Sequence, residues 1–277
     1  MAKSNGKTAL VTGSTDGVGR EVAQRLGRDG WRLLVHGRDR ERGEEVVAVI
    51  KKAGGTAEFI AADLSALAEV RRLADAVQKT TRRLDLLMNN AGIGSGGPQS
   101  VRQESTDGYE LRFAVNYLSG FLLTHLLLPL LKSSAPARIV NVSSLGQQAI
   151  DFDDVMLTHG YSGMRAYRQS KLAQILFTID LAAELAGTGV TVNTLHPATF
   201  MNTTMVRQFG TPMSTVEEGA DAIMRLAASP EMEGKTGLYF NGQREAKADA
   251  QAYDAAARQK LRALSFELAG LRAPTAG

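Results

Sequence analysis

The chain has 277 residues, of which 44% are hydrophobic and 22% charged, with a formal net charge of +3 and a pI near 9.1. It has no cysteine, which excludes disulfides and thiolate metal sites, and its four histidines lack metal-ligand spacing, so we expect no metal. Acidic and basic residues alternate, as at positions 38–45, which argues against a nucleic-acid partner. The mild positive charge suits a small anionic ligand.

Two segments bear on the location of the protein. The first six residues lack the hydrophobic run of a signal peptide or an anchor. The most apolar stretch, residues 118–131, is shorter than a membrane span and contains His125 and Pro129. We therefore expect a cytoplasmic protein with no membrane partner, in which this stretch is a buried or interface helix.

A strand, a glycine turn and a helix open the chain. Residues 7–12 are apolar and β-branched, a glycine-rich turn follows, and residues 31–36 supply the next strand after a helical pattern. This order is typical of a dinucleotide cradle, in which backbone N–H groups and the helix dipole hold a pyrophosphate; the alternative is an ordinary turn. The predicted cofactor contacts in this turn are Gly13, Ser14, Asp16, Gly17, Val18 and Gly19.

The end of the second strand selects the dinucleotide. An acidic side chain there would hold a ribose 2′-hydroxyl, whereas the sequence has Gly37 followed by Arg38, whose planar guanidinium suits a 2′-phosphate. We therefore predict a preference for NADP(H), with NAD(H) possible. Two observations weigh against it: Arg38 stands in a charged run where it could simply be solvated, and Asp16 adds a negative charge to the phosphate turn.

Further strand-like runs alternate with helical patterns at residues 56–62, 84–89, 138–143, 190–195 and 237–241. This alternation predicts a doubly wound, Rossmann-type α/β fold with a parallel sheet and helices on both faces. No linker interrupts the chain, so we predict one dinucleotide-binding domain over residues 1–277. Residues 246–271 are predicted to form an amphipathic helix that caps the substrate cleft, covers the sheet edge or meets a second subunit.

Tyr167 and Lys171 are one helical turn apart, which places a phenol beside an ammonium group. A nearby cation lowers the pKa of tyrosine from about 10, so the pair can act as a proton donor and acceptor near neutral pH. The alternative is an ordinary pair on a solvated helix face.

Taken with Asn90-Ala91-Gly92, Asn116 and Asn141-Val142-Ser143-Ser144, these motifs make the chain resemble the short-chain dehydrogenase/reductase family over nearly its whole length. The resemblance implies about seven parallel strands and an oxidoreductase that moves hydride between a nicotinamide cofactor and a carbonyl or alcohol. The further cofactor contacts that it implies are Asp63, Leu64, Asn90, Ala91, Gly92, Tyr167, Lys171, Pro197 and Thr199.

The resemblance also assigns a catalytic tetrad of Asn116, Ser144, Tyr167 and Lys171. Tyr167 would move the proton, Lys171 would hold the nicotinamide ribose and lower the pKa of Tyr167, and Ser144 would orient the substrate oxygen. Asn116 would hold a water that links the lysine to solvent, or would only brace its helix. Ser143 is the alternative to Ser144.

Two loop segments should face the substrate, because ligands of open α/β sheets bind at the carboxyl ends of the strands. The first, about 145–166, makes the Ser144–Tyr167 gap 167 − 144 = 23 positions, which resembles the insertion of the retinol-dehydrogenase-like, NADP-dependent branch. The second, about 198–215, is apolar and includes Met205 and Phe209. It is either a mobile lid over a hydrophobic substrate or a short helix packed in the core.

Other functions and assemblies stay open at the level of sequence. The chain could be a non-catalytic NAD(P)-binding redox sensor, or a reductase of a carbon–carbon double bond that uses the same tyrosine and lysine. Relatives commonly form oligomers through the helices that correspond to residues 109–131 and 163–184. We therefore expect a homodimer or a homotetramer.

Overall fold

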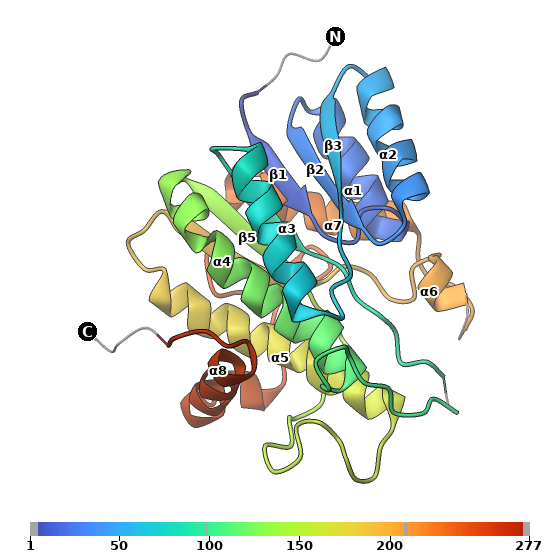
Figure 1. Ribbon diagram of the computed structural model, residues 1–277, viewed down its shortest axis with the longest axis vertical. Coiled ribbons are helices and arrows are strands. Elements are labelled where there is room, and N and C mark those ends of the chain that lie inside the picture. The colour runs from blue at the N-terminus through green and yellow to red at the C-terminus, as the bar shows by residue number, and fades with distance from the viewer. Residues whose placement is uncertain (1–4, 98, 208–209, 274–277) are drawn as a thin grey trace.

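The computed structural model describes residues 5–97, 99–207 and 210–273, which include one eight-stranded sheet of order β3-β2-β1-β4-β5-β6-β7-β8. All neighbouring strands pair in parallel except β7 and β8 (Figure 1). The strands are β1 (Thr8–Val11), β2 (Arg32–Gly37), β3 (Thr56–Ala61), β4 (Leu86–Asn89), β5 (Ala137–Val142), β6 (Val190–His196), β7 (Tyr239–Asn241) and β8 (Arg244–Ala246).

Helices cover both faces of this sheet, which confirms the predicted doubly wound class. The core on one side is built with α3, α4 and α5, and the core on the other with α1, α2 and α7 (Figure 1). The α-helices are α1 (Gly17–Arg28), α2 (Arg40–Lys52), α3 (Leu67–Thr80), α4 (Ser119–Ser133), α5 (Gly163–Glu184), α6 (Thr204–Arg207), α7 (Val216–Ala228) and α8 (Ala255–Leu268). Single turns of other types are the π-helix η1 (Phe113–Leu118) and the 3₁₀-helices η2 (Pro230–Met232) and η3 (Ala250–Tyr253).

The structure corrects two boundaries at the carboxyl end of the chain. An eighth, antiparallel strand follows β7 after a turn at Gly242, whose φ is +59°. Its three residues are too short and too exposed to show an apolar pattern, so the sequence did not predict it. The last helix begins at Ala255 rather than near residue 246, because the Asp254 side chain caps it by accepting a hydrogen bond from the Ala256 N–H.

The leucine-rich stretch lies in the core. By length and composition Phe113–Ser133 could cross a membrane, but 67% of its most apolar window is buried inside the protein. It packs against α3 and α5 as part of the larger hydrophobic cluster. This is the environment of a core helix in a folded domain, as expected for a buried stretch of this composition.

Helix α8 packs over α4 and α5, the pair through which the sequence predicts oligomers. Phe266 contacts the rings of Phe121 and His125 at centroid distances of 5.2 and 4.9 Å. The Tyr117 hydroxyl lies 2.6 Å from the Ser265 hydroxyl, and Arg262 forms an ion pair with Asp180 at 2.8 Å. The carboxyl-terminal helix therefore covers part of the expected subunit interface with the chain's own residues.

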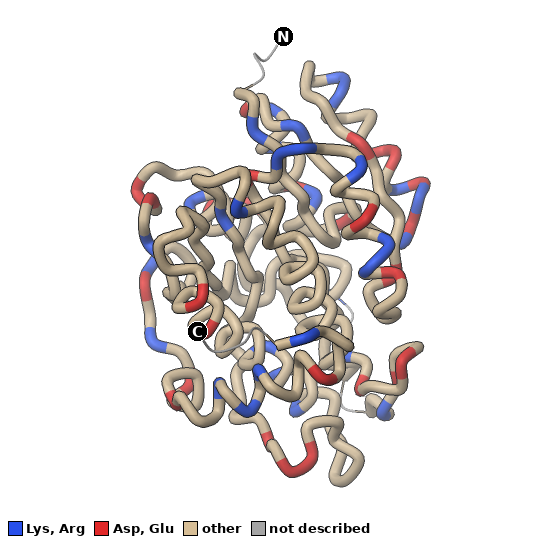
Figure 2. Tube along the Cα trace, turned by 60° about the vertical axis from the view of Figure 1, so that its left-hand side comes forward, with Lys and Arg blue, Asp and Glu red and all other residues tan. Residues whose placement is uncertain are grey.

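Charged side chains are distributed over the outside of the molecule. Figure 2 shows basic and acidic residues interspersed along the helices and loops rather than gathered into a stripe of one sign. Many basic residues have an acidic neighbour, as in the Arg25–Glu21 pair of α1 at 2.7 Å and the Arg262–Glu184 contact at 2.8 Å. Among the described residues, charges of both signs are therefore mixed along the chain.

The docking of α8 predicts a stability effect. Replacing Phe266, which is 4% exposed, with Ala should lower the free energy of unfolding by about 3–5 kcal/mol, because it leaves a cavity against Phe121 and His125. Urea unfolding measures this. Phe200→Ala is the control, since it removes the same ring from a 56% exposed site and should change stability by less than about 1 kcal/mol. Equal losses in the two variants would contradict the packing role of Phe266.

Candidate active site

The turn after β1 lies in direct backbone contact with the exit of β4. A Cβ on Gly13 would stand 2.8 Å from the Ala91 Cα, and one on Gly19 would stand 2.4 Å from both the Gly13 oxygen and the Asn90 Nδ2. Gly13 also has a φ of +64°. Side chains larger than hydrogen are therefore excluded at Gly13 and Gly19 by space, which makes room for backbone N–H groups to approach a ligand.

Thr12 and Asn90 hold this contact together. The Thr12 hydroxyl accepts from the N–H groups of Asn90 and Ala91 at 2.9 and 3.1 Å. The Asn90 amide donates to the carbonyls of Thr12 and Gly13 at 2.8 and 3.1 Å. The predicted segment Asn90-Ala91-Gly92 therefore lies against the glycine turn, and its Asn90 side chain is used in joining the two.

The other side chains predicted in the turn have structural partners. Ser14 is buried, and its hydroxyl donates to the Val11 carbonyl at 2.7 Å and accepts from the His36 N–H at 3.0 Å. Val18 packs in the core. Asp16 caps α1 by accepting from the Gly17 N–H at 2.7 Å. Any cofactor contact at Ser14 or Val18 would be made by their backbone, and the carboxylate of Asp16 would add charge repulsion beside a phosphate.

Arg38 lies at the end of β2, as the cofactor prediction requires. Its side chain is 71% exposed and its Nη1 is 4.0 Å from the Asp63 Oδ2, so it is only loosely paired. Gly37 before it is packed, since a Cβ there would stand 2.5 Å from the Thr15 methyl group. Leu64, the other predicted adenine contact, is 6% exposed in the core. The guanidinium is thus free to turn towards a 2′-phosphate.

A cavity of about 310 Å³ opens beside the glycine turn. Its lining combines Asp16 and Gly17 with Arg20 of α1 and with Thr203 and Arg207 of the segment after β6. The Thr203 methyl would lie 3.2 Å from a Cβ on Gly17. Sequence reasoning missed Arg20, Thr203 and Arg207 because the last two come from a segment far from the turn in the sequence. The lining also contains the carboxylates of Asp16, Glu21 and Glu217, which offset the two arginines.

The tetrad side chains converge at the carboxyl ends of β4, β5 and β6. Around Gly92, a Cβ would stand 3.2 Å from the Asn116 Oδ1 and 3.5 Å from the Lys171 Nζ. The Lys171 Nζ is 5.8 Å from the centroid of the Tyr167 ring. It donates to the Val142 carbonyl at 2.9 Å and to the Gln174 Oε1 at 3.0 Å. The structure brings the predicted lysine, tyrosine and asparagine together.

The structure corrects the predicted electrostatics of Tyr167. Burial raises the pKa of Tyr167 above its usual 10, and a hydrogen bond with Ser144 only opposes this. Burial also lowers the pKa of Lys171 to about 7, so its positive charge is partial at neutral pH. The pKa of Tyr167 is thus raised in this structure and not lowered as expected, because burial is its largest cause and Lys171, 5.8 Å from the ring centroid, is not among its causes. The role of Lys171 in proton transfer stays a prediction.

The two serines after β5 have different roles. The Ser143 hydroxyl is buried and donates to the Lys171 carbonyl at 2.7 Å. The Ser144 hydroxyl accepts from the Gly146 N–H at 3.0 Å and bonds with Tyr167. Ser144 is therefore the serine that faces the tyrosine, which favours it over Ser143. Its carbonyl is held by Tyr239 and Gln147, at 3.2 and 3.0 Å, two contacts that no pattern in the sequence indicated.

Asn116 lies in the π-helix η1, and both polar atoms of its side-chain amide are hydrogen-bonded. Its Oδ1 accepts from the Ile93 N–H at 2.8 Å, while its Nδ2 donates to the Ile93 carbonyl at 3.1 Å and to the Ser170 hydroxyl at 3.0 Å. Single π-turns occur often at functional sites. These contacts show the bracing role that the sequence left open for Asn116, and they place it between the β4 exit and α5.

After β6 the chain reaches the predicted contacts Pro197 and Thr199. The Thr199 hydroxyl lies 3.1 Å from the Nε2 of His196, whose pKa is lowered to about 4 by burial and by the Lys171 charge. His196 is therefore neutral at physiological pH and acts as a hydrogen-bonding partner. Thr199 is oriented by this contact at the mouth of the site.

Six exposed apolar side chains belong to segments that follow these strand ends or begin α5, and we call them the apolar rim. They come from the segments after β4, β5 and β6 and from the start of α5. The rim comprises Val101, Leu145, Met164, Phe200, Met205 and Met213, which are 37–72% exposed. Single exposed apolar residues are ordinary, so what bears on a ligand is that these six belong to the segments expected to face the substrate.

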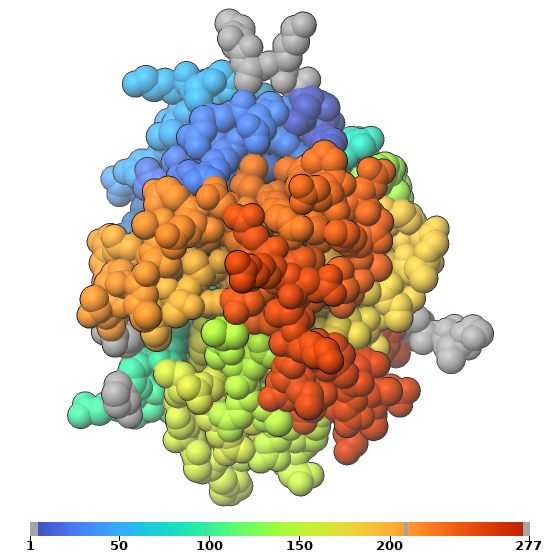
Figure 3. All heavy atoms as spheres, turned by 180° about the vertical axis from the view of Figure 1, so that it is seen from behind, coloured from blue at the N-terminus to red at the C-terminus, as the bar shows by residue number. Residues whose placement is uncertain are grey.

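The segment predicted as either lid or core helix has one side chain in the core and others at the surface, and the lid stays a prediction. Met201 packs against the core beneath α7, whereas Phe200, Met205 and Met213 are exposed. Phe209, part of the same prediction, lies outside the described residues. In Figure 3 the segment 145–165 lies beside residues 245–255, consistent with the Ile150 N–H bond to the Gln251 Oε1 at 2.6 Å. The first segment is thus anchored, and the second is only partly so.

Comparison with known proteins identifies the class. Residues 7–214 match the family described as short chain dehydrogenase, and the chain belongs to that family. Within it, human retinol dehydrogenase 14 is 39% identical, with 96% of this chain and 87% of that relative covered. The resemblance inferred from the sequence is confirmed, including the retinol-dehydrogenase-like branch. The protein is an oxidoreductase that uses a nicotinamide cofactor.

Solved structures support the same placement. An uncharacterised protein from Mycobacterium paratuberculosis has a TM-score of 0.81 at 29% identity, with 97% of this chain and 95% of that chain covered. The landomycin C-6 ketoreductase LanV, solved with NADP and rabelomycin, has a TM-score of 0.68 at 29% identity over 87% and 97% of the two chains. These neighbours share the Rossmann-type sheet and its helices.

The buried lysine predicts a pH-dependent stability. Folding lowers the pKa of Lys171 from its usual 10.5 to about 7, so the unfolded chain binds more protons between these values. The free energy of unfolding should therefore rise as the pH increases from 7 to 9, with the full penalty present below pH 7. Urea unfolding without added nucleotide, compared with Lys171→Met, measures it. If the free energy of unfolding changes equally with pH in the wild type and in the variant, the burial of Lys171 does not cause this pH dependence.

Proposed function

We propose that this protein is an NADP(H)-dependent reductase or dehydrogenase of a hydrophobic carbonyl or alcohol, with Tyr167 as the general acid and base. The observation that carries the proposal is the convergence of Tyr167, Lys171, Ser144 and Asn116 at neighbouring strand ends, within reach of the glycine turn. A proton donor, a cation and an orienting hydroxyl beside a dinucleotide cradle are what carbonyl reduction needs.

The chain's own residues supply the proton. In the reductive direction the Tyr167 hydroxyl donates its proton to the carbonyl oxygen, and the raised pKa of Tyr167 keeps it protonated until then. The Ser144 hydroxyl, which bonds with Tyr167, fixes the same oxygen. Lys171 stabilises the phenolate that remains, because a positive charge beside it becomes favourable once the proton has left. Oxidation of an alcohol uses the same contacts in reverse.

The cradle fits a nicotinamide dinucleotide. The Gly13–Ala91 and Gly19–Asn90 contacts exclude side chains where a pyrophosphate would lie, and Arg20 and Arg207 line the adjoining cavity. Arg38 would hold the 2′-phosphate. When bound, the nicotinamide supplies or accepts the hydride. Preference for NADP over NAD rests on the exposed guanidinium of Arg38 and on the lack of an acidic residue at the end of β2.

The apolar rim supports a hydrophobic substrate. Leu145 and Met164 flank the segments that carry Ser144 and Tyr167, and Phe200, Met205 and Met213 lie across the site. One relative and one solved structure carry names that agree with this, retinol dehydrogenase 14 and the landomycin C-6 ketoreductase LanV with bound rabelomycin. Met side chains in the rim would adapt to substrates of different shapes.

The packing of α8 bears on the predicted homodimer or homotetramer. A homodimer or homotetramer built on η1, α4 and α5 would have to displace α8, whose Phe266 packs on Phe121. We propose that any oligomer uses other surfaces. Light scattering of the Phe266→Ala variant addresses this: larger particles than in the wild type would mean that α8 blocks that face. The cytoplasmic location and the absence of membrane and nucleic-acid partners stay predictions.

Loss of Arg38 should abolish the preference for NADPH. A hydrogen bond to a charged group contributes roughly 1.5–3 kcal/mol, so Arg38→Ala should weaken NADPH binding about tenfold to a hundredfold and leave NADH binding within about twofold. Nucleotide fluorescence titrations measure both. Arg42→Ala is the matched control, since Arg42 is 57% exposed and pairs with Asp39 at 3.5 Å. Equal affinity of the wild type for both nucleotides would refute the role of Arg38.

Catalysis should distinguish the two serines. Tyr167→Phe should reduce kcat for a hydrophobic ketone with NADPH by more than about a hundredfold, because the proton donor is removed, and Ser144→Ala by about tenfold to a hundredfold. Nucleotide absorbance follows the reaction. Ser143→Ala should leave more activity than Ser144→Ala. If Ser143→Ala is the less active variant, Ser143 and not Ser144 orients the substrate oxygen. Unchanged activity in Tyr167→Phe would favour the redox-sensing alternative. With an α,β-unsaturated ketone as substrate, a saturated ketone product in place of an allylic alcohol would indicate double-bond reduction.

A further inference from the structure

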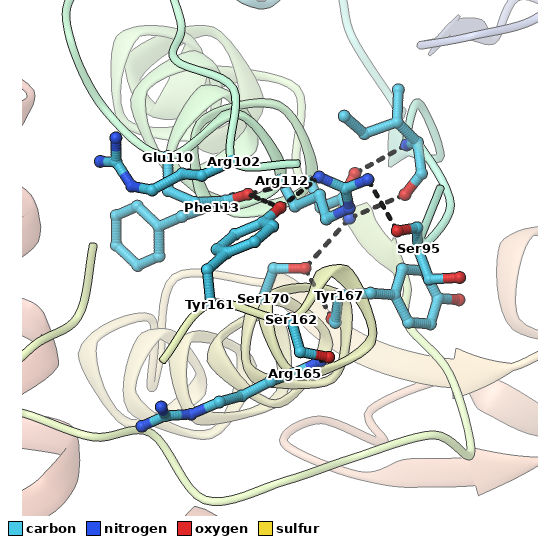
Figure 4. Close-up of polar contacts among 12 residues, drawn as sticks. Ser95, Arg102, Glu110, Arg112, Phe113, Tyr161, Ser162, Arg165, Tyr167 and Ser170 are labelled. Atoms are coloured by element: carbon cyan, nitrogen blue, oxygen red, sulfur yellow. Dashed lines mark hydrogen bonds and ion pairs between the residues drawn. The ribbon is translucent and has the colours of Figure 1, made fainter. Parts of the chain in front are cut away.

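A buried ion pair lies directly before η1, the helix that carries Asn116. Arg112 and Glu110 are 4% and 1% exposed, and the Arg112 Nη1 is 3.5 Å from the Glu110 Oε1 (Figure 4). A buried guanidinium is strongly destabilising unless its donors are bonded. The partners of Arg112 therefore show which parts of the chain it holds together.

Arg112 binds two different segments. Its Nε donates to the Gly94 carbonyl at 2.9 Å and its Nη2 to the Ser95 carbonyl at 2.7 Å, both in the loop after β4. Its Nη1 donates to the Tyr161 hydroxyl at 2.6 Å, at the end of the segment 145–162 (Figure 4). A Cβ on Gly96 would stand 2.5 Å from the Nη2, so the loop backbone lies tightly over the guanidinium.

Glu110 and Tyr161 complete the cluster. The Tyr161 hydroxyl accepts from Arg112 and donates to the Glu110 Oε1 at 3.1 Å, while the Glu110 Oε2 accepts from the Phe113 N–H at 2.7 Å. Burial, with the Glu110 charge, raises the pKa of Tyr161 to about 12, so its hydroxyl keeps the proton that this bond needs. The guanidinium charge is balanced and every member of the cluster has a partner.

The same loop is held again one helical turn later. Asn116 bonds both backbone groups of Ile93, at 2.8 and 3.1 Å, so two side chains four positions apart fix the backbone of residues 93–95. This loop continues directly from Gly92, where a Cβ would stand 3.5 Å from the Lys171 Nζ. Arg112 is thus connected to the catalytic groups through a short stretch of backbone, without touching them.

We propose that Arg112 is a positioning residue that clamps residues 93–95 to η1 and, through Tyr161, couples the segment 145–162 to the catalytic side of the site. The inference rests on the proposed function for its catalytic consequence. The clamp holds Asn116 and the backbone beside Lys171 in register with α5, where Tyr167 lies. When the clamp is loosened, the proton-transfer groups move relative to one another. The reaction rate is very sensitive to such a displacement.

Arg138 provides the matched control. It is a half-buried arginine that also donates to backbone carbonyls, those of Leu226 and Ser229 at 3.2 and 2.8 Å. Its contacts lie at the start of β5 and the end of α7, at the opposite end of the sheet from the tetrad. Arg138→Met therefore removes a comparable contact and leaves the site intact.

The first measurement is hydrogen–deuterium exchange of the whole protein without nucleotide. Arg112→Met should accelerate exchange of the Ile93 N–H and its neighbours in residues 92–96, and also of residues 157–163, by at least about tenfold. Arg138→Met should accelerate exchange only around α7. Tyr161→Phe should affect residues 157–163 more than residues 92–96. If the amides of residues 92–96 exchange no faster in Arg112→Met than in Arg138→Met, Arg112 does not clamp this loop.

The second measurement separates positioning from general stability. Per folded molecule, Arg112→Met should reduce kcat by about tenfold to a hundredfold, while the dissociation constant for NADPH stays within about twofold. Arg112→Lys keeps the charge but not the planar fork, and should recover part of the rate. If the Arg112 variants match Arg138→Met in kcat, Arg112 has only a structural role. If the wild type reduces no carbonyl, the proposed function fails, and exchange still decides the clamp.

Discussion

The contact between the glycine turn and the exit of β4 is the constraint on which the rest of the site depends. Gly13 and Gly19 lie so close to Ala91 and Asn90 that no Cβ fits, and Thr12 and Asn90 join the two segments by four hydrogen bonds. Because the backbone is fixed there, the chain leaves β4 in one direction, towards η1 and α5. The cofactor cradle and the proton-transfer groups are thus built on one rigid corner of the sheet.

Burial governs the electrostatics of that corner. It lowers the pKa of Lys171 to about 7 and raises that of Tyr167, so near neutral pH the lysine carries a partial charge beside a protonated phenol. A lysine and a tyrosine four positions apart on an exposed helix would act differently, with a full charge and a lowered phenol pKa. The spacing in the sequence therefore identified the partners, but the depth at which they lie determines their protonation. A charge that arises during proton transfer is stabilised more strongly in such a site than in water.

The sequence predicted the class of fold and most of the site because both depend on local patterns. Apolar runs, the glycine turn and helical spacing indicated seven of the strands and the Tyr167–Lys171 pair, whereas Asn116 and Ser144 came from the resemblance to the family. Contacts between distant segments left no such pattern. Tyr239 holds the Ser144 carbonyl from a strand 95 positions away in the chain, and β8 is too short for a periodicity. The docking of α8 likewise depends on a tertiary contact of Phe266 with Phe121.

The two sides of the site differ in how firmly they are held. On the cofactor side and in the 93–95 loop, backbone groups are bonded to buried side chains, including Asn116 and Arg112. On the substrate side, Phe200, Met205 and Met213 are exposed, and most hydrogen bonds described for their segment join its own residues, as between Met213 and Phe200 and between Ser214 and Thr199. Hydride and proton transfer need fixed geometry, whereas apolar recognition of varied substrates needs surfaces that can repack. A rigid chemical centre beneath an adaptable apolar rim combines the two, and Tyr161 links the first of the substrate segments to the rigid part.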